Sequence, residues 1–239
     1  MAARATRGFG QYSGVARAVE RVGERWALLI VRDLLAGARR YSDLKAGLPR
    51  IPTNILSDRL KELQEAGVIR RVPTVRGGYE LTALGRGLEP VVLALERWGW
   101  SALGEPAEGE VLTADALAVA LRAAFQADVS RTLPSTEYVL HVADVSISAV
   151  VADGALDVVA IGPGALPQPR RRLAAPPPAD VLELAVDVAG FRPLLGDGPR
   201  SATVLAGGDE LLERFLRTFR ITPDPGVDAA HAADESSVA

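Results

Sequence analysis

A histidine and several nearby hydroxyl and carboxyl groups are the first candidates for chemistry. They are His141, Asp144, Ser135, Ser146 and Ser148. A Ser-His-Asp hydrolytic set could be drawn from them. Such a set also needs a nucleophile held on a sharp turn and hydrogen-bond donors for the oxyanion, and neither is recognisable here. A half-exposed histidine on a strand is the better interpretation, so we predict no catalytic residues and no enzyme activity.

Two short glycine motifs invite a nucleotide-binding interpretation. Gly207-Gly-Asp-Glu210 has the letters of the diguanylate cyclase signature, but it stands alone at a turn into a predicted helix. Gly162-Pro-Gly164 lies in a proline-rich stretch without an immediately following helix, which disfavours a phosphate cradle. We expect neither motif to bind a nucleotide.

The composition excludes several other classes of site. The 239 residues contain no cysteine and only two histidines, His141 and His231, so we expect no disulfide, no metal site and no cofactor. No apolar run approaches the roughly 18 residues that cross a bilayer, and the basic start lacks the apolar core of a signal peptide. We therefore predict a cytoplasmic protein without membrane insertion.

The net charge of −3 conceals two halves of opposite sign. Residues 1–105 hold 17 Lys and Arg against 11 Asp and Glu, a net of +6, and residues 106–239 hold 10 against 19, a net of −9. Such asymmetry indicates two modules with different partners, the basic one a candidate for nucleic acid. Gly, Pro and acidic residues between 103 and 110 mark the boundary. We predict domains at 1–104 and 110–221, followed by a disordered tail at 222–239.

The first half has the element order of a winged helix-turn-helix. The predicted helices are Val15–Val22, Arg25–Ala36, Ser42–Gly47 with Ser42 as its N-cap, Thr53 to Ala66, and Ala83–Trp100. Val68–Pro73 and Tyr79–Leu81 flank Gly77-Gly78, which predicts a hairpin before the last helix. This hairpin is the expected wing.

The fourth helix carries the expected DNA-reading face. Leu56, Leu60 and Leu63 repeat at spacings of four and three, so they share the side that packs on the domain. The opposite side is polar, and recognition helices present such a side to base edges while arginines hold phosphates. The predicted DNA contacts are Arg40, Tyr41, Ser42, Arg50, Thr53, Asn54, Ser57, Asp58, Lys61 and Arg76. Arg59 lies beside the leucines, where an ion pair or a phosphate contact is expected as much as base reading.

Several signatures in this half resemble the HxlR-type regulators, relatives of the MarR group. They are Val19–Gly37, Arg40-Tyr-Ser-Asp-Leu44, Ile51–Leu63 and Tyr79–Gly85, in the order of that family. The resemblance implies a bacterial transcription regulator that binds an inverted-repeat operator as a homodimer. Its dimerising elements would be the stretch up to Val22 and the helix ending at Trp100. Many members carry a cysteine near the start, where this chain has Tyr12-Ser13, which argues against a thiol sensor.

The second half predicts an α/β sandwich-like domain, so the fold class is α+β. Its predicted elements are a helix at Thr113–Ala127, strands at Tyr138–Val142, Val145–Ala152 and Leu156–Ile161, a strand or mixed element at Val181–Val188, and a closing helix at Gly207–Phe219. Asp153-Gly154 is a strong hairpin turn. A helix, an antiparallel meander, a closing helix and its Gly-Asp turn resemble the sterol-carrier-protein-2-like fold, which encloses an apolar tunnel. That resemblance implies a hydrophobic ligand, with Phe125, Phe191, Phe215 and Phe219 as lining residues.

Together these features predict a DNA-binding regulator whose partner is double-stranded DNA, with DNA affinity modulated by a hydrophobic small molecule in the second domain. Two alternatives stay open. The second half could be a lipid or hydrophobic-ligand carrier, with the winged helix serving protein contacts. It could also be a dimerisation or partner-docking module without a ligand, which a filled core would favour.

Overall fold

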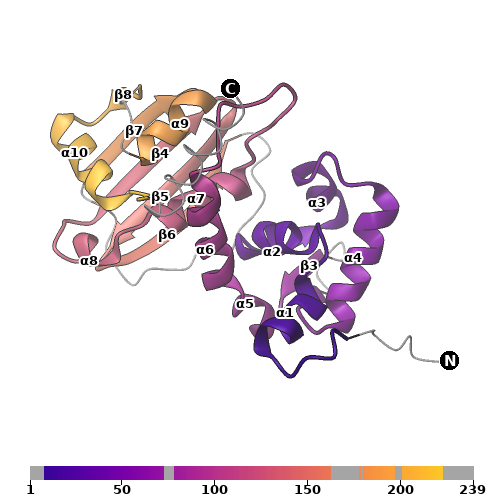
Figure 1. Cartoon of the computed structure of the whole chain (residues 1–239). Coiled ribbons are helices and arrows are strands. Elements are labelled where there is room, and N and C mark those ends of the chain that lie inside the picture. Colours follow the sequence, from indigo (N-terminus) through magenta and orange to yellow (C-terminus); the bar gives the residue numbers. More distant parts are fainter. Residues whose placement is uncertain (1–7, 73–77, 163–177, 179, 197–200, 223–239) are drawn as a thin grey trace, which may run out of the picture. The chain divides into compact units, whose positions relative to one another are not determined.

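The computed structural model describes residues 8–72, 78–162, 178, 180–196 and 201–222 (Figure 1). These residues form two compact units, Met1–Val92 and Leu93–Ala239. The predicted tail at 222–239 and the proline-rich stretch with Arg170–Arg172 fall almost entirely outside the described residues. The division lies inside one helix, ahead of the boundary expected from composition, and the domain limits at 104–110 remain a prediction.

The N-terminal unit contains the expected helices and a small sheet. The helices are α1 (Gly14–Val22), α2 (Ala27–Leu35), α3 (Tyr41–Gly47), α4 (Thr53–Glu65), α5 (Ala83–Arg86) and the start of α6 (Glu89–Trp100). Strands β2 (Ile69–Val72) and β3 (Gly78–Leu81) form the predicted hairpin, and β1 (Arg39–Arg40) adds a third strand in the order β1-β3-β2. The winged helix-turn-helix order is therefore present.

Helix boundaries follow local chemistry. Ser13 caps α1, since its hydroxyl accepts a hydrogen bond of 3.5 Å from the Ala16 amide. The prediction that Ser42 caps α3 is wrong. Arg40 occupies the N-cap position, and its amide donates a hydrogen bond of 2.8 Å to Asp43 Oδ2. The carboxylate of Asp43, one residue after Ser42, reaches back to that orphan amide, so the helix begins earlier than expected.

The predicted helix Ala83–Trp100 is two helices. Thr82 caps α5 by accepting a hydrogen bond of 3.1 Å from the Gly85 amide, and α5 ends at Gly87 before α6 begins at Glu89. Gly85 lies so close to the hairpin that a β-carbon there would stand 2.1 Å from the Val68 carbonyl oxygen. Glycine is thus required where α5 meets β2 and β3.

The C-terminal unit is a five-stranded sheet with helices against one face (Figure 1). Its strands are β4 (Thr136–Val142), β5 (Val145–Ala152), β6 (Ala155–Ile161), β7 (Asp180–Val186) and β8 (Thr203–Ala206), in the order β6-β5-β4-β7-β8. Its helices are α7 (Ala114–Ala124), α8 (Ala127–Ser130), α9 (Val188–Leu195) and α10 (Asp209–Thr218). β4 pairs with β5 antiparallel and with β7 parallel.

The three predicted strands, the first helix and the closing helix of this unit are confirmed within a few residues. Asp153 and Gly154 both have positive φ, 51° and 75°, as the predicted two-residue turn between β5 and β6 requires. The open choice at Val181–Val188 is resolved as a strand, β7, that ends at Val186. Three short elements, α8, α9 and β8, were not expected.

The alternation of β4 shows which face is covered. Tyr138, Leu140 and Val142 are buried under the helices, whereas Val139 and His141 between them are half-exposed on the other face.

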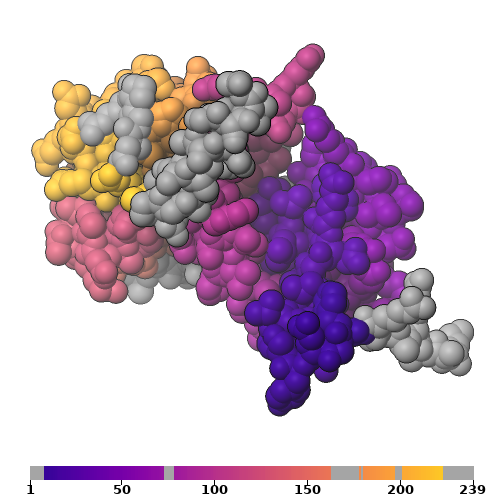
Figure 2. All heavy atoms as spheres, viewed as in Figure 1, coloured from indigo at the N-terminus to yellow at the C-terminus, as the bar shows by residue number. Residues whose placement is uncertain are grey.

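The yellow helix α10 reaches the molecular surface on the side viewed in Figure 2. None of the described helices is long and apolar enough to cross a membrane.

Candidate nucleic-acid interface

The side of α4 that holds it in the domain is the leucine side predicted from spacing. Leu56, Leu60 and Leu63 are each at most 1% exposed. The Val68 amide donates a hydrogen bond of 2.9 Å to the Leu63 carbonyl, so the chain turns from the end of α4 directly into the hairpin. The helix is thereby fixed in rotation, and its polar side must face outward.

The outward side of α4 carries the polar residues predicted to reach bases. Thr53, Asn54, Ser57, Asp58 and Lys61 are all exposed. Asn54 lies in the first turn, and its amide group can both accept and donate, as a bidentate contact to adenine requires. Lys61 stands 3.9 Å from Glu65, a loose surface pair that leaves its ammonium available for a guanine or a phosphate.

The start of α4 is joined to α3 by hydroxyl groups. The Tyr41 hydroxyl donates a hydrogen bond of 2.9 Å to the Thr53 carbonyl, and Ser57 Oγ lies 3.4 Å from the same hydroxyl and donates to the same carbonyl at 3.1 Å. Tyr41 and Ser57 therefore position the first turn of α4, in addition to any contact that they make with DNA.

Lys45 was not among the residues predicted from the sequence. Its ammonium donates hydrogen bonds to the carbonyl oxygens of Ile51 at 2.8 Å and Pro49 at 3.3 Å. These bonds close the turn between α3 and α4. A lysine four residues before Pro-Arg-Ile-Pro was the available signal, since such a turn exposes carbonyl groups.

Two arginines and a helix start form a cationic border. Arg40 and Arg50 are both exposed. Arg40 immediately precedes α3, and Arg50 lies in the turn before α4. The residue at the N-cap of α4 is Pro52, whose side chain has no oxygen to accept the first amide groups of the helix. Free amide groups and the positive end of the helix dipole favour a phosphate beside Arg50.

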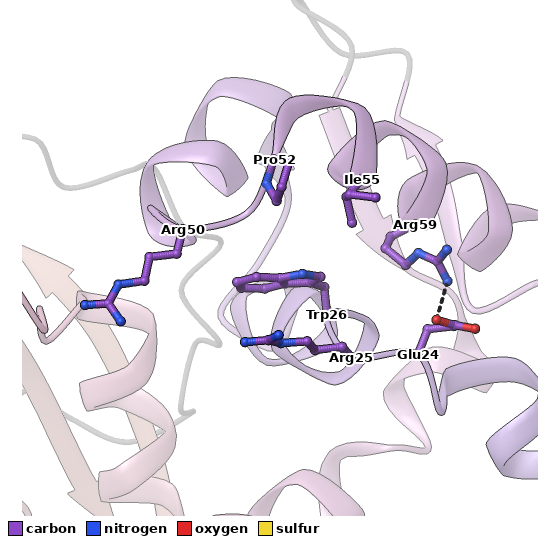
Figure 3. A pocket seen from close by; sticks show the side chains of 7 residues that line it. All are labelled: Glu24, Arg25, Trp26, Arg50, Pro52, Ile55 and Arg59. Carbon is purple, nitrogen blue, oxygen red and sulfur yellow. Dashed lines mark ion pairs between the residues drawn. The ribbon is translucent and has the colours of Figure 1, made fainter.

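Three further arginines of the region contact other side chains of the protein. Arg59 forms ion pairs with Glu24 at 3.1 Å (Figure 3) and Glu62 at 2.5 Å, so the ion pair, one of its expected roles, is observed. Arg70 pairs with Glu80, and the Arg71 guanidinium lies 5.5 Å from the centre of the Tyr79 ring. Arg76 and the hairpin turn lie outside the described residues, so their contact with DNA stays a prediction.

The four phenylalanines predicted to line a ligand site contact other aromatic rings. Phe215 and Phe219 lie 5.0 Å apart between ring centres, and each is 5.4 Å from Tyr138. Phe125 is 5.9 Å from Phe219. Phe191 contacts Trp100 instead, at 5.8 Å. These rings therefore fill core space in the described structure, and a ligand would have to displace or separate them.

The chemistry drawn around His141 has a different carboxylate from the one expected. Its Nδ1 lies 2.7 Å from Ser146 Oγ, and its Nε2 lies 2.8 Å from Glu183 Oε1. Glu183 belongs to β7, which the sequence could not place beside β4. The row lies on the half-exposed face of the sheet, where it links three strands, consistent with the expected strand histidine.

Comparison with known proteins decides the affiliation of the N-terminal unit. The model of the HxlR-like helix-turn-helix family matches residues 21–106. The HTH-type transcriptional regulator YvaP of Bacillus subtilis is 41% identical over 86 residues, which cover 34% of this chain and 80% of that protein. The chain belongs to the HxlR-like family. These relatives are regulators rather than enzymes, in agreement with the predicted absence of enzyme activity.

Other relatives match the same part of this HxlR-like chain. The HTH-type regulator Rv3095 of Mycobacterium tuberculosis is 44% identical over 96 residues, which span 38% of this chain and 60% of the relative. Among solved structures, the HTH-type transcriptional regulator ytcD is 36% identical with a TM-score of 0.35, over 36% of this chain and 93% of that one. The redox regulator HypR is 30% identical with a TM-score of 0.35, over 37% and 92%.

Proposed function

We propose that this chain is a DNA-binding transcriptional regulator that inserts α4 into the major groove of an inverted-repeat operator as a homodimer. Membership of the HxlR-like family supports the DNA-binding role. The single observation that carries the geometry is the exposed first turn of α4, with Asn54 outward and three leucines inward. Two recognition helices in such a dimer would lie about 34–36 Å apart, one turn of DNA.

Exposed apolar side chains support the dimer. On α1, Val15 is 74% exposed and Val19 is 44% exposed. On α6, Val91, Leu95 and Trp98 are 47%, 44% and 62% exposed. Apolar groups gathered on helices at the ends of a domain favour burial against a second copy, and these are the helices that the family resemblance assigned to dimerisation.

The C-terminal unit is proposed to modulate DNA binding through a hydrophobic small molecule, in keeping with its helix, meander and closing helix. Such coupling requires the ligand to bind one state better than the other. The ring contacts of Phe215 and Phe219 with Tyr138 instead favour a docking module with a filled core. Native mass spectrometry of the purified chain distinguishes the ligand site from the docking module. A lipid that co-purifies with the untreated chain supports the ligand site. Equal masses of the untreated and delipidated chains support the docking module.

The test of the DNA-binding role is fluorescence anisotropy with DNA from upstream of the chain's own gene, beside a scrambled duplex, across a salt series. We expect tighter binding to the upstream DNA and a steep loss of affinity as salt rises. Equal and weak binding to both duplexes would contradict the proposal. It would favour the alternative in which the C-terminal unit is a carrier.

A further inference from the structure

Strand β6 forms one edge of the C-terminal sheet, and within the described residues no strand pairs with its outer side (Figure 1). It pairs with β5 over its whole length without a bulge. Its sequence, Ala-Leu-Asp-Val-Val-Ala-Ile, contains no proline, no lysine and one charged residue, Asp157. Edge strands are normally short, bulged or charged, because a long flat edge pairs with other chains. One carboxylate is the only such protection in β6.

The opposite edge of the sheet is better protected. β8 has four residues, against seven in β6, and a register shift interrupts its pairing with β7 between Glu183 and Leu184. The acidic first turn of α10, with Asp209 and Glu210, follows closely after it. A short, bulged edge near carboxylates is a poor template for a further strand. The edge that favours pairing is therefore that of β6.

The hairpin determines which backbone groups of β6 face outward. The two-residue turn Asp153-Gly154 makes Ala152 and Ala155 a hydrogen-bonded pair between β5 and β6. Such pairs alternate along an antiparallel ladder, so every second residue of β6 from Ala155 onward bonds to β5. The residues between them direct their N–H and C=O groups away from β5. They are Leu156, Val158 and Ala160.

We propose that this edge pairs with the same edge of a second copy, antiparallel and centred on Val158, so that two five-stranded sheets join across a two-fold axis. Val158 then lies opposite Val158 of the partner subunit, and Leu156 lies opposite Ala160 of the partner subunit. All the outward N–H and C=O groups of both strands gain hydrogen bonds in this register. A contact of one surface with its own copy is the kind that a symmetric dimer requires.

The side chains of β6 suit this register. Leu156 faces an alanine, and on the other side of the sheet Ala155 faces Ile161 of the partner subunit, so large residues lie opposite small ones. Asp157 lies opposite Val159 of the partner subunit, so its carboxylate does not face another carboxylate. Like charges directly opposite each other would destabilise the pairing, and this register avoids them.

The neighbouring registers are less favourable. Pairing centred on Asp157 would place two carboxylates directly opposite each other. Pairing centred on Val159 would place Leu156 opposite Gly162, beyond the end of the strand, and would leave part of the edge without a strand partner. Charge and strand length therefore both select the register centred on Val158.

The inference rests on the homodimer of the proposed function. A stable interface buries about 1,200–2,000 Å² of total surface, which is more than the edges of two seven-residue strands supply. The β6 edges therefore pair only when the N-terminal helices already hold two copies together and raise the effective concentration of the edges. A chain whose helix interface is lost should be monomeric, and the β6 pairing should be lost with it.

Two substitutions at one position test the pairing and its register in the full chain. Val159 is half-exposed, on the face of the sheet opposite the buried Val158. Val159→Asp places a carboxylate opposite Asp157 of the partner subunit, twice in each dimer, whereas Val159→Lys places an ammonium there. We expect the dimer Kd from sedimentation equilibrium to be about tenfold or more higher for Val159→Asp than for Val159→Lys. Equal Kd values would refute the register.

Val181→Asp is the matched control for this comparison. Val181 is exposed on β7, two strands away from β6 in the sheet. The variant should leave the dimer Kd unchanged. A rise as large as that of Val159→Asp would show that the contact involves the face of the sheet rather than its edge, and would overturn the proposal.

Amide hydrogen exchange of the unmodified chain, followed by NMR, needs no substitution. We expect the amides of Leu156, Val158 and Ala160 to exchange about tenfold or more slowly above the dimer Kd than below it, because only the dimer gives them a hydrogen-bond partner. The amides of Asp157 and Val159 bond to β5 in monomer and dimer alike, so they provide the internal reference.

The exchange rates separate the possible outcomes. Fast exchange at the three outward amides in a chain that sediments as a dimer would refute the β6 pairing and leave the homodimer in place. Slow exchange in the dilute monomer would mean that the chain covers its own β6 edge, which would refute the second copy as occupant. A chain that sediments as a monomer at every concentration would refute the homodimer together with the pairing, and the DNA titrations test DNA binding separately.

Discussion

The hydroxyl of Tyr41 donates a hydrogen bond of 2.9 Å to the backbone carbonyl of Thr53, the first residue of α4. This bond joins the first residue of α3 to the first residue of α4 across the turn that Lys45 closes. The two helices of the motif are thus connected at the end nearest the expected bases. In the proposed complex with DNA, the angle at which Asn54 would enter a groove depends on that connection.

Tyr41→Phe removes the hydroxyl and leaves the ring. Loss of one such bond should reduce the free energy of unfolding by about 0.5–1.5 kcal/mol, measured by urea denaturation. Operator affinity should fall in addition, because the first turn of α4 loses an anchor. Tyr12→Phe is the matched control, since Tyr12 is fully exposed. Equal behaviour of the two variants would mean that the Tyr41 bond contributes nothing.

Asn54→Ala and Arg50→Ala should separate base reading from phosphate binding. Asn54→Ala should reduce the preference for operator over scrambled DNA by about 1–3 kcal/mol, because a bidentate base contact is lost. Arg50→Ala should weaken binding to both duplexes and reduce the salt slope by about one. Anisotropy titrations at several salt concentrations measure both quantities. Our placement of the DNA face would be wrong if both variants bound like the parent chain.

Val19→Glu should dissociate the proposed dimer, because a carboxylate in an apolar interface loses its hydration without gaining a partner. Light scattering coupled to size-exclusion chromatography should show the mass change from dimer to monomer. Val181→Glu is a close control, because Val181 is also 44% exposed but lies on β7 of the C-terminal unit. A dimer that survives Val19→Glu but not Val181→Glu would move the interface to the sheet.

Arg214→Met tests the polar centre of the C-terminal core. The Arg214 side chain is 9% exposed and donates hydrogen bonds to Asp180 at 2.7 Å and Thr136 at 3.1 Å. Burial alone would lower the pKa of Arg214, but the hydrogen bond and charge of Asp180, together with Tyr138 and Glu210, outweigh it, so the pKa is raised. Removing the charged donor should lower the free energy of unfolding by about 1.5–3 kcal/mol.

Arg131→Met provides the comparison for that measurement. Arg131 pairs with Asp128 at 2.8 Å, but their side chains are 65% and 93% exposed. Exposed pairs contribute about 0–1 kcal/mol, so this variant should be nearly neutral in thermal or urea denaturation. A loss as large as that of Arg214→Met would show that burial of the pair does not matter.

Periodicity and turn chemistry were sufficient for most of the elements. Three features depend on residues no more than four positions apart, so the local sequence specifies them. They are the spacing of the leucines in α4, the serine cap of α1 and the Asp153-Gly154 turn. The same reasoning failed at Ser42, because the carboxylate of Asp43 accepts a hydrogen bond from the Arg40 amide and Arg40 becomes the N-cap residue. Gly87 ended a helix whose apolar pattern continues on both sides.

The parts that could not be predicted depend on residues far apart in sequence. Glu183 meets His141 only because β7 pairs with β4, and Glu24 meets Arg59 only because the segment before α2 lies against α4. The short elements α9 and β8 have little periodicity of their own. Packing against the sheet determines them, and a single sequence does not contain that information in local form.

The parallel pairing of β4 with β7 has a consequence for biosynthesis. Thr136 pairs with Asp180 and Val142 with Val186. The pairing at the centre of the sheet therefore forms only after β7 has been translated, later than β5 and β6. Until then the hairpin strands expose the unpaired edge of β4, which is a template for association with other chains. Contacts this distant in sequence also slow folding. The N-terminal unit is translated completely before β4 and should be able to fold on the ribosome first, and a chain truncated before β7 should be prone to aggregation.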